Sequence, residues 1–187
     1  MSRIPYTDVV LVDCEDNEIG RMEKLEAHEK GILHRAFSIL VFNDKNELLL
    51  QQRAFGKYHS EGLWTNTCCS HPLPGESNLS AAHRRLVEEM GIICDLEEIF
   101  NFIYRAELDH GLIENELDYV IIGRSDETPL LNLKETIAYK WMNLEEIRQD
   151  ILLNPTHYTH WFKIIILNHF DKLTTYLTHE SLQKRNI

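Results

Sequence analysis

Short apolar runs separated by polar turns predict a chain of mixed strands and helices. Apolar, β-branched or alternating stretches are typical of strands, and they occur at 9–12, 37–42, 47–52, 99–106, 113–123 and 138–142. Turn-forming residues at 43–46 lie between the second and third stretches. Asn and Asp favour turns, so we expect a hairpin there.

Helical spacing appears in three further places. Apolar residues recur on one stripe over 78–90, and Gly91 stands where a left-handed helix end is expected. A short helix is predicted at 144–147, and an apolar stripe predicts one C-terminal helix containing Phe162, Ile165, Ile166, Phe170 and Leu173. Residues 54–77 are rich in glycine and proline and predict a long ordered loop. Strands with flanking helices indicate an α/β or α+β sandwich.

Composition narrows the class of protein. A chain of 187 residues suggests one domain spanning 1–187. Its net charge of -11 argues against a nucleic-acid binder or a polybasic membrane module. No apolar run approaches the roughly 18 residues of a membrane span, and residues 1–6 lack the pattern of a signal peptide. Four cysteines form no disulfide framework. We expect a cytoplasmic protein without an obligate protein partner.

Two carboxylates lie in a predicted strand. Glu114 and Glu116 project from one face because side chains alternate along a strand. A solvent-facing edge strand would explain them equally well. The apolar residues that follow, however, carry the strand into the core, where two like charges require a cation. Three histidines supply natural co-ligands for a metal, namely His28, His34 and His71.

A thiol and several cations complete the candidate chemistry. Cys68 and Cys69 precede His71 in an aromatic-rich loop, and alternation allows only one of the two thiols to face a given pocket. Inert packing is the usual role of free cysteine. The basic residues would bind an anion if they surround one cleft; they are Lys24, Arg53, Lys57, Arg84 and Arg85.

The segment 75–92 resembles a Nudix box, in which a glycine precedes a helix that carries glutamates for Mg²⁺. Arg85 replaces the first glutamate of the box and lies one helical turn from Glu89. This departure disfavours hydrolysis and leaves Glu89 as a magnesium ligand.

Further strings resemble one branch of that superfamily, the type I isopentenyl-diphosphate isomerases. They occur in the expected order between about residues 8 and 165, at 24–28, 34–38, 52–57, 64–72, 75–77, 104–106, 114–116 and 161. Agreement of several separate strings is far more specific than a single motif.

The resemblance implies a reaction and a set of site residues. A double bond in isopentenyl diphosphate would move to give dimethylallyl diphosphate, through a carbocation-like state. By similarity, Cys69 and Glu116 form the acid/base pair, Tyr104 assists proton transfer, and Trp161 faces the developing cation. A protein-bound Mn²⁺ or Zn²⁺ would be held by His28, His34, His71, Glu114 and Glu116. Mg²⁺ at Glu89 would bridge the diphosphate, which would be bound by Lys24, Arg53, Lys57 and Arg85.

Two alternatives remain open at this point. The chain could hydrolyse another diphosphate, or it could be a non-catalytic domain that binds a metal or a partner. Cys68 is an extra thiol that we expect to face away from the site. Asp118 shares the strand face of both glutamates, and the sequence offers no explanation for its additional charge.

Overall fold

The computed structural model describes residues 8–184. The signal-peptide expectation rests on residues 1–6, which lie outside the described residues. The strands are β1 (Asp8–Val12), β2 (Glu18–Glu23), β3 (His34–Phe42), β4 (Glu47–Arg53), β5 (Trp64–Thr65), β6 (Cys68–Ser70), β7 (Leu96–Glu107), β8 (Ile113–Arg124) and β9 (Thr136–Asn143). The helices are α1 (Lys24–Lys30), α2 (Asn78–Met90), α3 (Leu144–Leu153), α4 (His160–Asn168) and α5 (Phe170–Lys184).

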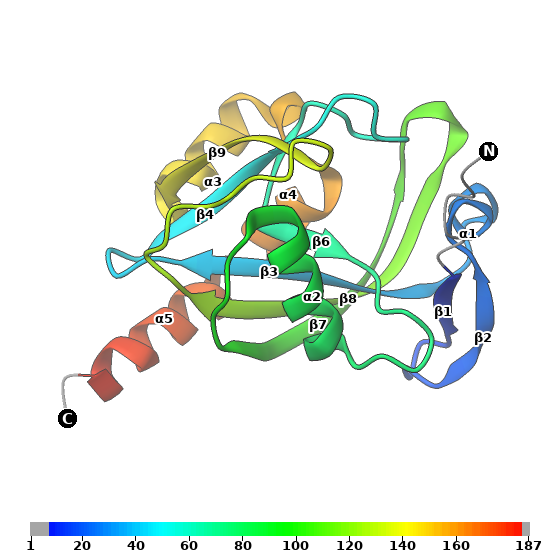
Figure 1. Cartoon of the computed structure of the whole chain (residues 1–187), viewed down its shortest axis with the longest axis horizontal. Coiled ribbons are helices and arrows are strands. Elements are labelled where there is room, and N and C mark those ends of the chain that lie inside the picture. Colours follow the sequence, from blue (N-terminus) through cyan, green and yellow to red (C-terminus); the bar gives the residue numbers. More distant parts are fainter. Residues whose placement is uncertain (1–7, 185–187) are drawn as a thin grey trace.

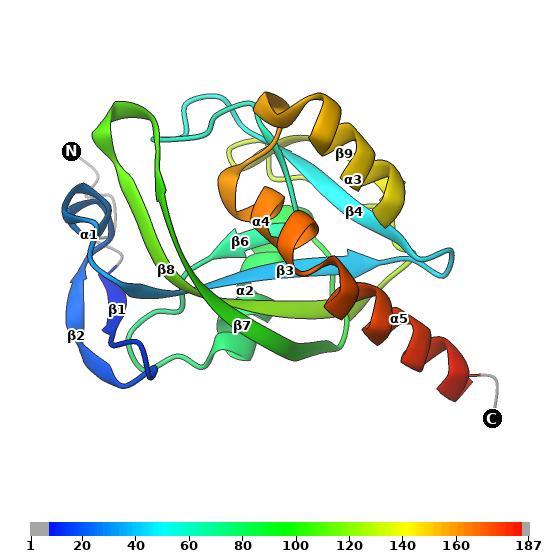
Figure 2. The ribbon, with the colours of Figure 1, turned by 180° about the vertical axis from the view of Figure 1, so that it is seen from behind.

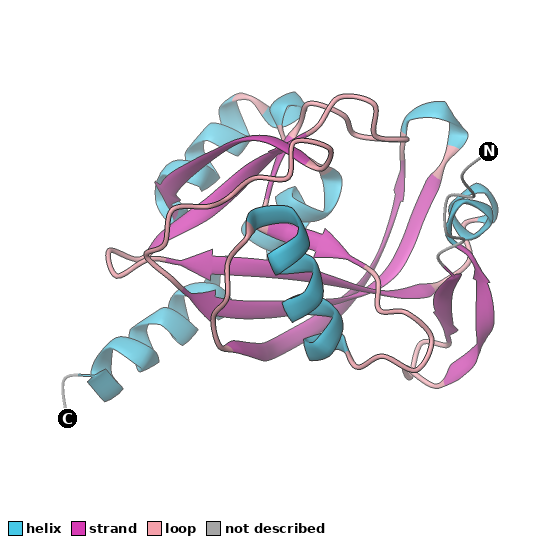
Figure 3. Ribbon diagram, in the orientation of Figure 1, coloured by secondary structure: helices cyan, strands magenta, loops and turns pink. Residues whose placement is uncertain are grey.

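One mixed sheet organises the described part of the chain. β3 lies at its centre and pairs in parallel with β8 but antiparallel with β1, β4 and β6. β7 pairs with the other side of β8, and β9 with β4. Helix α2 lies in front of the sheet (Figure 1), whereas α3, α4 and α5 lie on the opposite side (Figure 2). Figure 3 shows the same helix–sheet–helix arrangement by element type, which confirms the predicted sandwich.

Alternation along the strands gives each face of the sheet its own core. Ile39 and Val41 of β3 pack toward α2 with Leu86 and Met90. Leu40 and Phe42 point to the other face, where they join a cluster that includes side chains of α3, α4 and α5. The central strand therefore has no solvated face, as its nearly continuous apolar sequence requires.

The predicted elements are confirmed where the sequence pattern is long. Helix α2 has the predicted bounds, and Gly91 adopts a left-handed φ of 66° at its end. A Cβ atom at position 91 would also lie only 2.8 Å from Leu130. Both the left-handed backbone and the lack of space therefore favour glycine at this position. The turn at 43–46 is present, but β3 and β4 pair only between Phe42 and Leu48 before they separate.

Several expectations are wrong in detail. The helix predicted at 144–147 continues to Leu153 as α3. The loop over 54–77 contains β5 and β6, which are too short to show periodicity and form because they pair with β4 and β3. The single C-terminal helix is broken at His169, whose ring packs against Phe100 and Phe102 at 5.0 and 4.7 Å. Neither β2 nor α1, which are six and seven residues long, was predicted from the sequence.

No helix among residues 8–184 is long and apolar enough to cross a membrane. All four cysteines are free, as expected for a chain without a disulfide framework.

Candidate active site

The pairing of the strands brings Glu116 together with two residues that were predicted to share its site. Glu116 of β8 lies directly opposite His34 of β3 and Tyr104 of β7. Because β8 has a neighbour on each side, it is not an edge strand. Glu114 and Glu116 are only 3% and 6% exposed, so the solvent-facing alternative is wrong.

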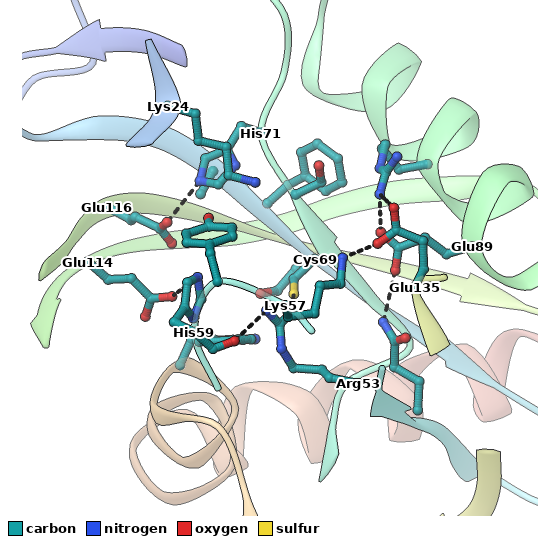
Figure 4. A pocket seen from close by; sticks show the side chains of 18 residues that line it. Lys24, Arg53, Lys57, His59, Cys69, His71, Glu89, Glu114, Glu116 and Glu135 are labelled. Carbon is teal, nitrogen blue, oxygen red and sulfur yellow. Dashed lines mark hydrogen bonds and ion pairs between the residues drawn. The ribbon is translucent and has the colours of Figure 1, made fainter. Parts of the chain in front are cut away.

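Three histidines converge on one oxygen of Glu116. The Nε2 atoms of His71, His34 and His28 lie 2.9, 3.4 and 3.7 Å from Glu116 Oε1. His28 comes from α1, His34 from β3 and His71 from the segment after β6 (Figure 4 labels His71 beside Glu116). The predicted convergence of these residues is therefore present.

The imidazoles are oriented for metal binding. Nδ1 of His28 lies 2.7 Å from the carbonyl oxygen of Lys24, and Nδ1 of His34 lies 2.8 Å from that of Ile32. These contacts place the ring proton on Nδ1 and leave the Nε2 lone pair free. Both Nε2 atoms are buried without a hydrogen-bond partner. Burial also lowers the pKa of His71 to about 3, so its imidazole is neutral, as a metal ligand must be.

The ligand atoms of these three histidines and Glu116 lie within 4.8 Å of one another. Ligands bound about 2.1 Å from one ion are at most roughly 4.3 Å apart, so the side chains need to move little to hold it. The residues therefore fit a divalent metal.

Glu114 belongs to a second group, which the sequence analysis missed. Its carboxylate lies with His28 and His59 within 4.8 Å, and His59 Nε2 is 3.8 Å from Glu114 Oε1. His59 is 5% exposed, and burial lowers its pKa to about 2. It lies in an irregular loop, where no periodicity could have marked it.

Tyr104 links the two carboxylates. Its hydroxyl lies 2.6 Å from an oxygen of Glu116 and 3.0 Å from an oxygen of Glu114. Burial and the Glu116 charge raise the pKa of Glu114 well above its usual range. Burial would also raise the pKa of Glu116, but His34 and His71 outweigh it and hold that pKa well below its usual range. The two carboxyls thus differ in their affinity for a proton.

The paired cysteines face opposite sides of the sheet. Cys68 is fully buried in the core beneath α2, as expected of the extra thiol. Cys69 lines the pocket that also contains Glu114 and Glu116. Burial raises the pKa of the Cys69 thiol to about 12, so it retains its proton at neutral pH. In Figure 4, Cys69 lies between the glutamates of β8 and those on the opposite side of the pocket.

Arg53 and Trp161 form another wall of the pocket. The Arg53 guanidinium donates hydrogen bonds to the carbonyl oxygens of Ser60 and His59 at 3.1 and 3.2 Å. Its Cζ lies 5.3 Å from the centre of the Trp161 ring. Trp161 Nε1 donates to Asn66 Oδ1 at 3.0 Å, which fixes the indole at the start of α4.

The opposite side of the pocket is basic, with two acidic counter-ions. Arg85 Nη2 contacts Glu89 Oε1 at 2.5 Å and Glu135 Oε1 at 3.4 Å, and Lys57 pairs with the other oxygen of Glu135. Lys24, Arg53, Lys57 and Arg85 all line the pocket, as predicted for a site that binds an anion. Arg84 instead pairs with Glu76 at 2.7 Å. Glu135 is a further charged residue of the pocket that was not predicted from the sequence.

Two further details affect the charge of the site. Burial, with lesser contributions from nearby cations, lowers the pKa of Lys24 to about 8. Asp118 is buried, accepts a 2.8 Å hydrogen bond from Ser38 and has a pKa raised well above its usual range by burial and by Glu116. Burial and Glu116 thus favour the protonated form of Asp118 more than that of an exposed aspartate.

The fold is shared with solved structures of low sequence identity. DR0079 from Deinococcus radiodurans superposes with a TM-score of 0.71 at 16% identity, covering 85% of this chain and 96% of that one. A MutT protein from Methanosarcina mazei gives a TM-score of 0.62 at 23% identity, covering 76% and 95%. A NUDIX domain model matches residues 32–162.

Curated relatives are much closer in sequence. Isopentenyl-diphosphate Delta-isomerase of Pectobacterium atrosepticum is 53% identical over 161 residues, covering 86% of this chain and 90% of the relative. Isopentenyl-diphosphate Delta-isomerase 2 of Photorhabdus laumondii is 56% identical over 158 residues, covering 84% and 89%. With its Nudix fold and this degree of identity over most of its length, the chain belongs to the isopentenyl-diphosphate Delta-isomerase family.

Proposed function

We propose that this protein interconverts isopentenyl diphosphate and dimethylallyl diphosphate by adding one proton and removing another. The observation that carries the proposal is one pocket lined by a protonated thiol, a buried carboxylate and four cations. The names of the relatives support the same reaction.

Cys69 and Glu116 are proposed as the acid/base pair. Cys69 holds a proton because its pKa is about 12, whereas the low pKa of Glu116 favours the free carboxylate. Each turnover gives one proton to an alkene carbon and takes one from another carbon, so the pair keeps the same number of protons. The Tyr104 hydroxyl contacts both glutamates and is proposed to assist transfer at Glu116.

Trp161 is proposed to stabilise the intermediate cation. Protonation of the terminal methylene gives a tertiary carbocation-like state, which water would capture if it had access. An indole face attracts such a charge by about 2 kcal/mol when water is excluded. The hydrogen bond from Trp161 to Asn66 supports this role because it holds the ring in one orientation.

Lys24, Arg53, Lys57 and Arg85 are proposed to bind the diphosphate. Glu135 and Glu89 now neutralise two of these cations, and a bound diphosphate would compete with them for Lys57 and Arg85. Anchoring the unreactive end orients a five-carbon unit that has few polar groups of its own.

Two divalent ions are proposed. One is Mn²⁺ or Zn²⁺ held by His28, His34, His71, Glu114 and Glu116, and the other is Mg²⁺ that accompanies the diphosphate at Glu89. The protein-bound metal supplies positive charge beside Glu116 and so favours its ionised form. The unpartnered Nε2 atoms of His28 and His34 support this assignment.

A direct assay separates this function from diphosphate hydrolysis. Purified protein with Mg²⁺ and isopentenyl diphosphate should produce dimethylallyl diphosphate, followed by ¹H and ³¹P NMR, with no release of inorganic phosphate. Release of phosphate or diphosphate would support a hydrolase instead. Unchanged substrate with folded, metal-loaded protein would support a binding domain.

We also propose that the whole chain works as a single domain in the cytoplasm. The continuous sheet supports the first point, and the four free cysteines support a reducing compartment.

A further inference from the structure

His59 has no role in the proposed reaction, yet its surroundings are those of a metal ligand. Its side chain is buried within the pocket, and its ring centre lies 5.9 Å from that of His28. Ligand atoms of His28, His59 and Glu114 lie within 4.8 Å of one another. Tertiary structure therefore places a fourth imidazole beside His28, one of the three histidines that were predicted.

The contact between His59 and Glu114 is not a hydrogen bond. The distance from Nε2 to Oε1 is 3.8 Å, whereas an N–H···O bond spans no more than about 3.2 Å. Two atoms bound about 2.1 Å from one ion lie between roughly 3.0 Å and 4.3 Å apart, depending on the angle between the bonds. The observed spacing fits two ligands of one ion.

The remaining atoms of His59 have partners that orient the ring. Nδ1 lies 3.1 Å from Ser60 Oγ, and the carbonyl oxygen accepts a hydrogen bond from Arg53 at 3.2 Å. With Nδ1 engaged by Ser60, Nε2 is the atom that faces Glu114. The same arrangement orients His28 and His34, whose Nδ1 atoms contact backbone carbonyls.

The two potential ligand groups share His28, whose Nε2 can bind only one ion. An ion bound there would be within reach of both groups, because His28 belongs to each of them. We propose that His59 is a fourth imidazole ligand of this metal and binds it from the side of Glu114. The inference rests on the proposed function only through the presence of the protein-bound metal.

This ligand set has a consequence for metal choice. Four imidazoles with two carboxylates form a nitrogen-rich site, which suits Zn²⁺, Co²⁺ or Fe²⁺ better than the oxygen-preferring Mg²⁺. His59 would thereby separate the metal held by the protein from the magnesium that arrives with the diphosphate.

The test counts imidazole ligands by NMR of the Co²⁺-loaded protein without substrate. Each bound imidazole that keeps its ring proton gives one exchangeable N–H signal, strongly shifted by the ion. We expect four such signals in the wild type and three in His59→Ala. His34→Ala, loaded with excess Co²⁺ because it should bind the ion more weakly, is the positive control and should also lose one signal. His83→Ala is the matched control, because His83 is exposed on α2, and its spectrum should keep all four.

His59→Gln serves as a second variant if His59→Ala fails to fold, and it should likewise show three signals. Three signals in the wild type that persist in a His59 variant would overturn the proposal. A parallel turnover assay keeps the two proposals distinct: four signals without isomerase activity would overturn the proposed function and leave the His59 assignment standing.

Discussion

The two ends of the pocket are built by different means. At the carboxylate–histidine end, Glu116 is fixed by strand register between His34 and Tyr104, and unpartnered imidazole nitrogens point toward it. At the basic end, Lys57 and Arg85 come from a loop and a helix and already have Glu135 as a counter-ion. The first end gathers ligand atoms that fit a cation, whereas the second end can exchange an internal anion for an external one. A substitution at one end should therefore impair metal binding and leave diphosphate binding intact, and a substitution at the other end should do the reverse.

The largest effect is expected between the two ends, at the thiol. Cys69→Ala should lower kcat by about 10³-fold or more, since it removes one member of the acid/base pair. Steady-state kinetics on variants with confirmed metal content provide the measurement. The neighbouring variant Cys68→Ala is the control and should retain near wild-type kcat, because Cys68 lies in the core beneath α2. Equal losses in both variants would contradict the assignment of Cys69.

Removing one histidine from the carboxylate–histidine end should weaken metal binding there. His34→Ala should lose bound metal and at least about 100-fold in kcat, because the metal no longer holds Glu116. The wild type saturated with metal at 100 times its Kd should gain about 2.7 kcal/mol in free energy of unfolding over the metal-free protein. Metal analysis and thermal unfolding with and without a chelator measure both effects. A His34→Ala protein with full metal content and activity would contradict this view of the site.

The basic end should respond mainly in KM. Lys57→Ala removes one charged contact with the diphosphate and should raise KM about 10-fold or more, with a smaller change in kcat. It should leave metal content unchanged, which distinguishes it from His34→Ala. Lys45→Ala, on an exposed turn, is the charge-matched control. A fall in kcat alone would show that Lys57 acts on the chemical step.

The pH dependence of kcat/KM tests the contribution of Lys24 to the basic end of the pocket. Lys24 has a pKa lowered to about 8, so it is charged below pH 8 and becomes neutral above it. We expect kcat/KM to fall above pH 8, approaching about tenfold per pH unit. Lys24→Arg should remove this descending limb, because arginine stays protonated. A limb that persists unchanged in Lys24→Arg belongs to another group.

The smallest effect is expected at Asp118. Burial and Glu116 raise its pKa and so favour the neutral carboxylic acid. An amide has nearly the same shape as that acid and is also uncharged. Asp118→Asn can still accept the hydrogen bond from Ser38 and should change the free energy of unfolding by less than about 1 kcal/mol. Urea denaturation tests this. A loss of several kcal/mol would show that Asp118 carries charge in the folded protein.

Local patterns in the sequence predicted which acidic and basic side chains share one face of a strand or helix. Alternation placed Glu114 and Glu116 on one face, and helical spacing placed Arg85 beside Glu89; the structure confirms both. The position of His34 opposite Glu116 depends on which strands pair, and a parallel β3–β8 pair joins segments about 80 residues apart in sequence. No local pattern encodes that pairing, so the sequence identifies the histidines as possible co-ligands but does not show that they converge.

The parts that the sequence did not predict are short or irregular. His59 and Glu135 lie in connecting segments whose course is set by contacts with the rest of the fold, such as the hydrogen bond from Ala54 N–H to the Glu135 carbonyl. Helix α1 is seven residues long, too short to be stable alone. The ring of His169 packs against β7 where the helix breaks. The sequence does not mark this break, because the apolar stripe continues through it.

The most direct test of the account is isomerisation in deuterated water. The protein is incubated with isopentenyl diphosphate and Mg²⁺, and the product is examined by ¹H and ²H NMR. The account predicts dimethylallyl diphosphate with deuterium in the methyl group formed from the terminal methylene, because the added proton comes from an exchangeable group. Dimethylallyl diphosphate without deuterium, or free diphosphate in its place, would contradict protonation by an exchangeable acid in this pocket.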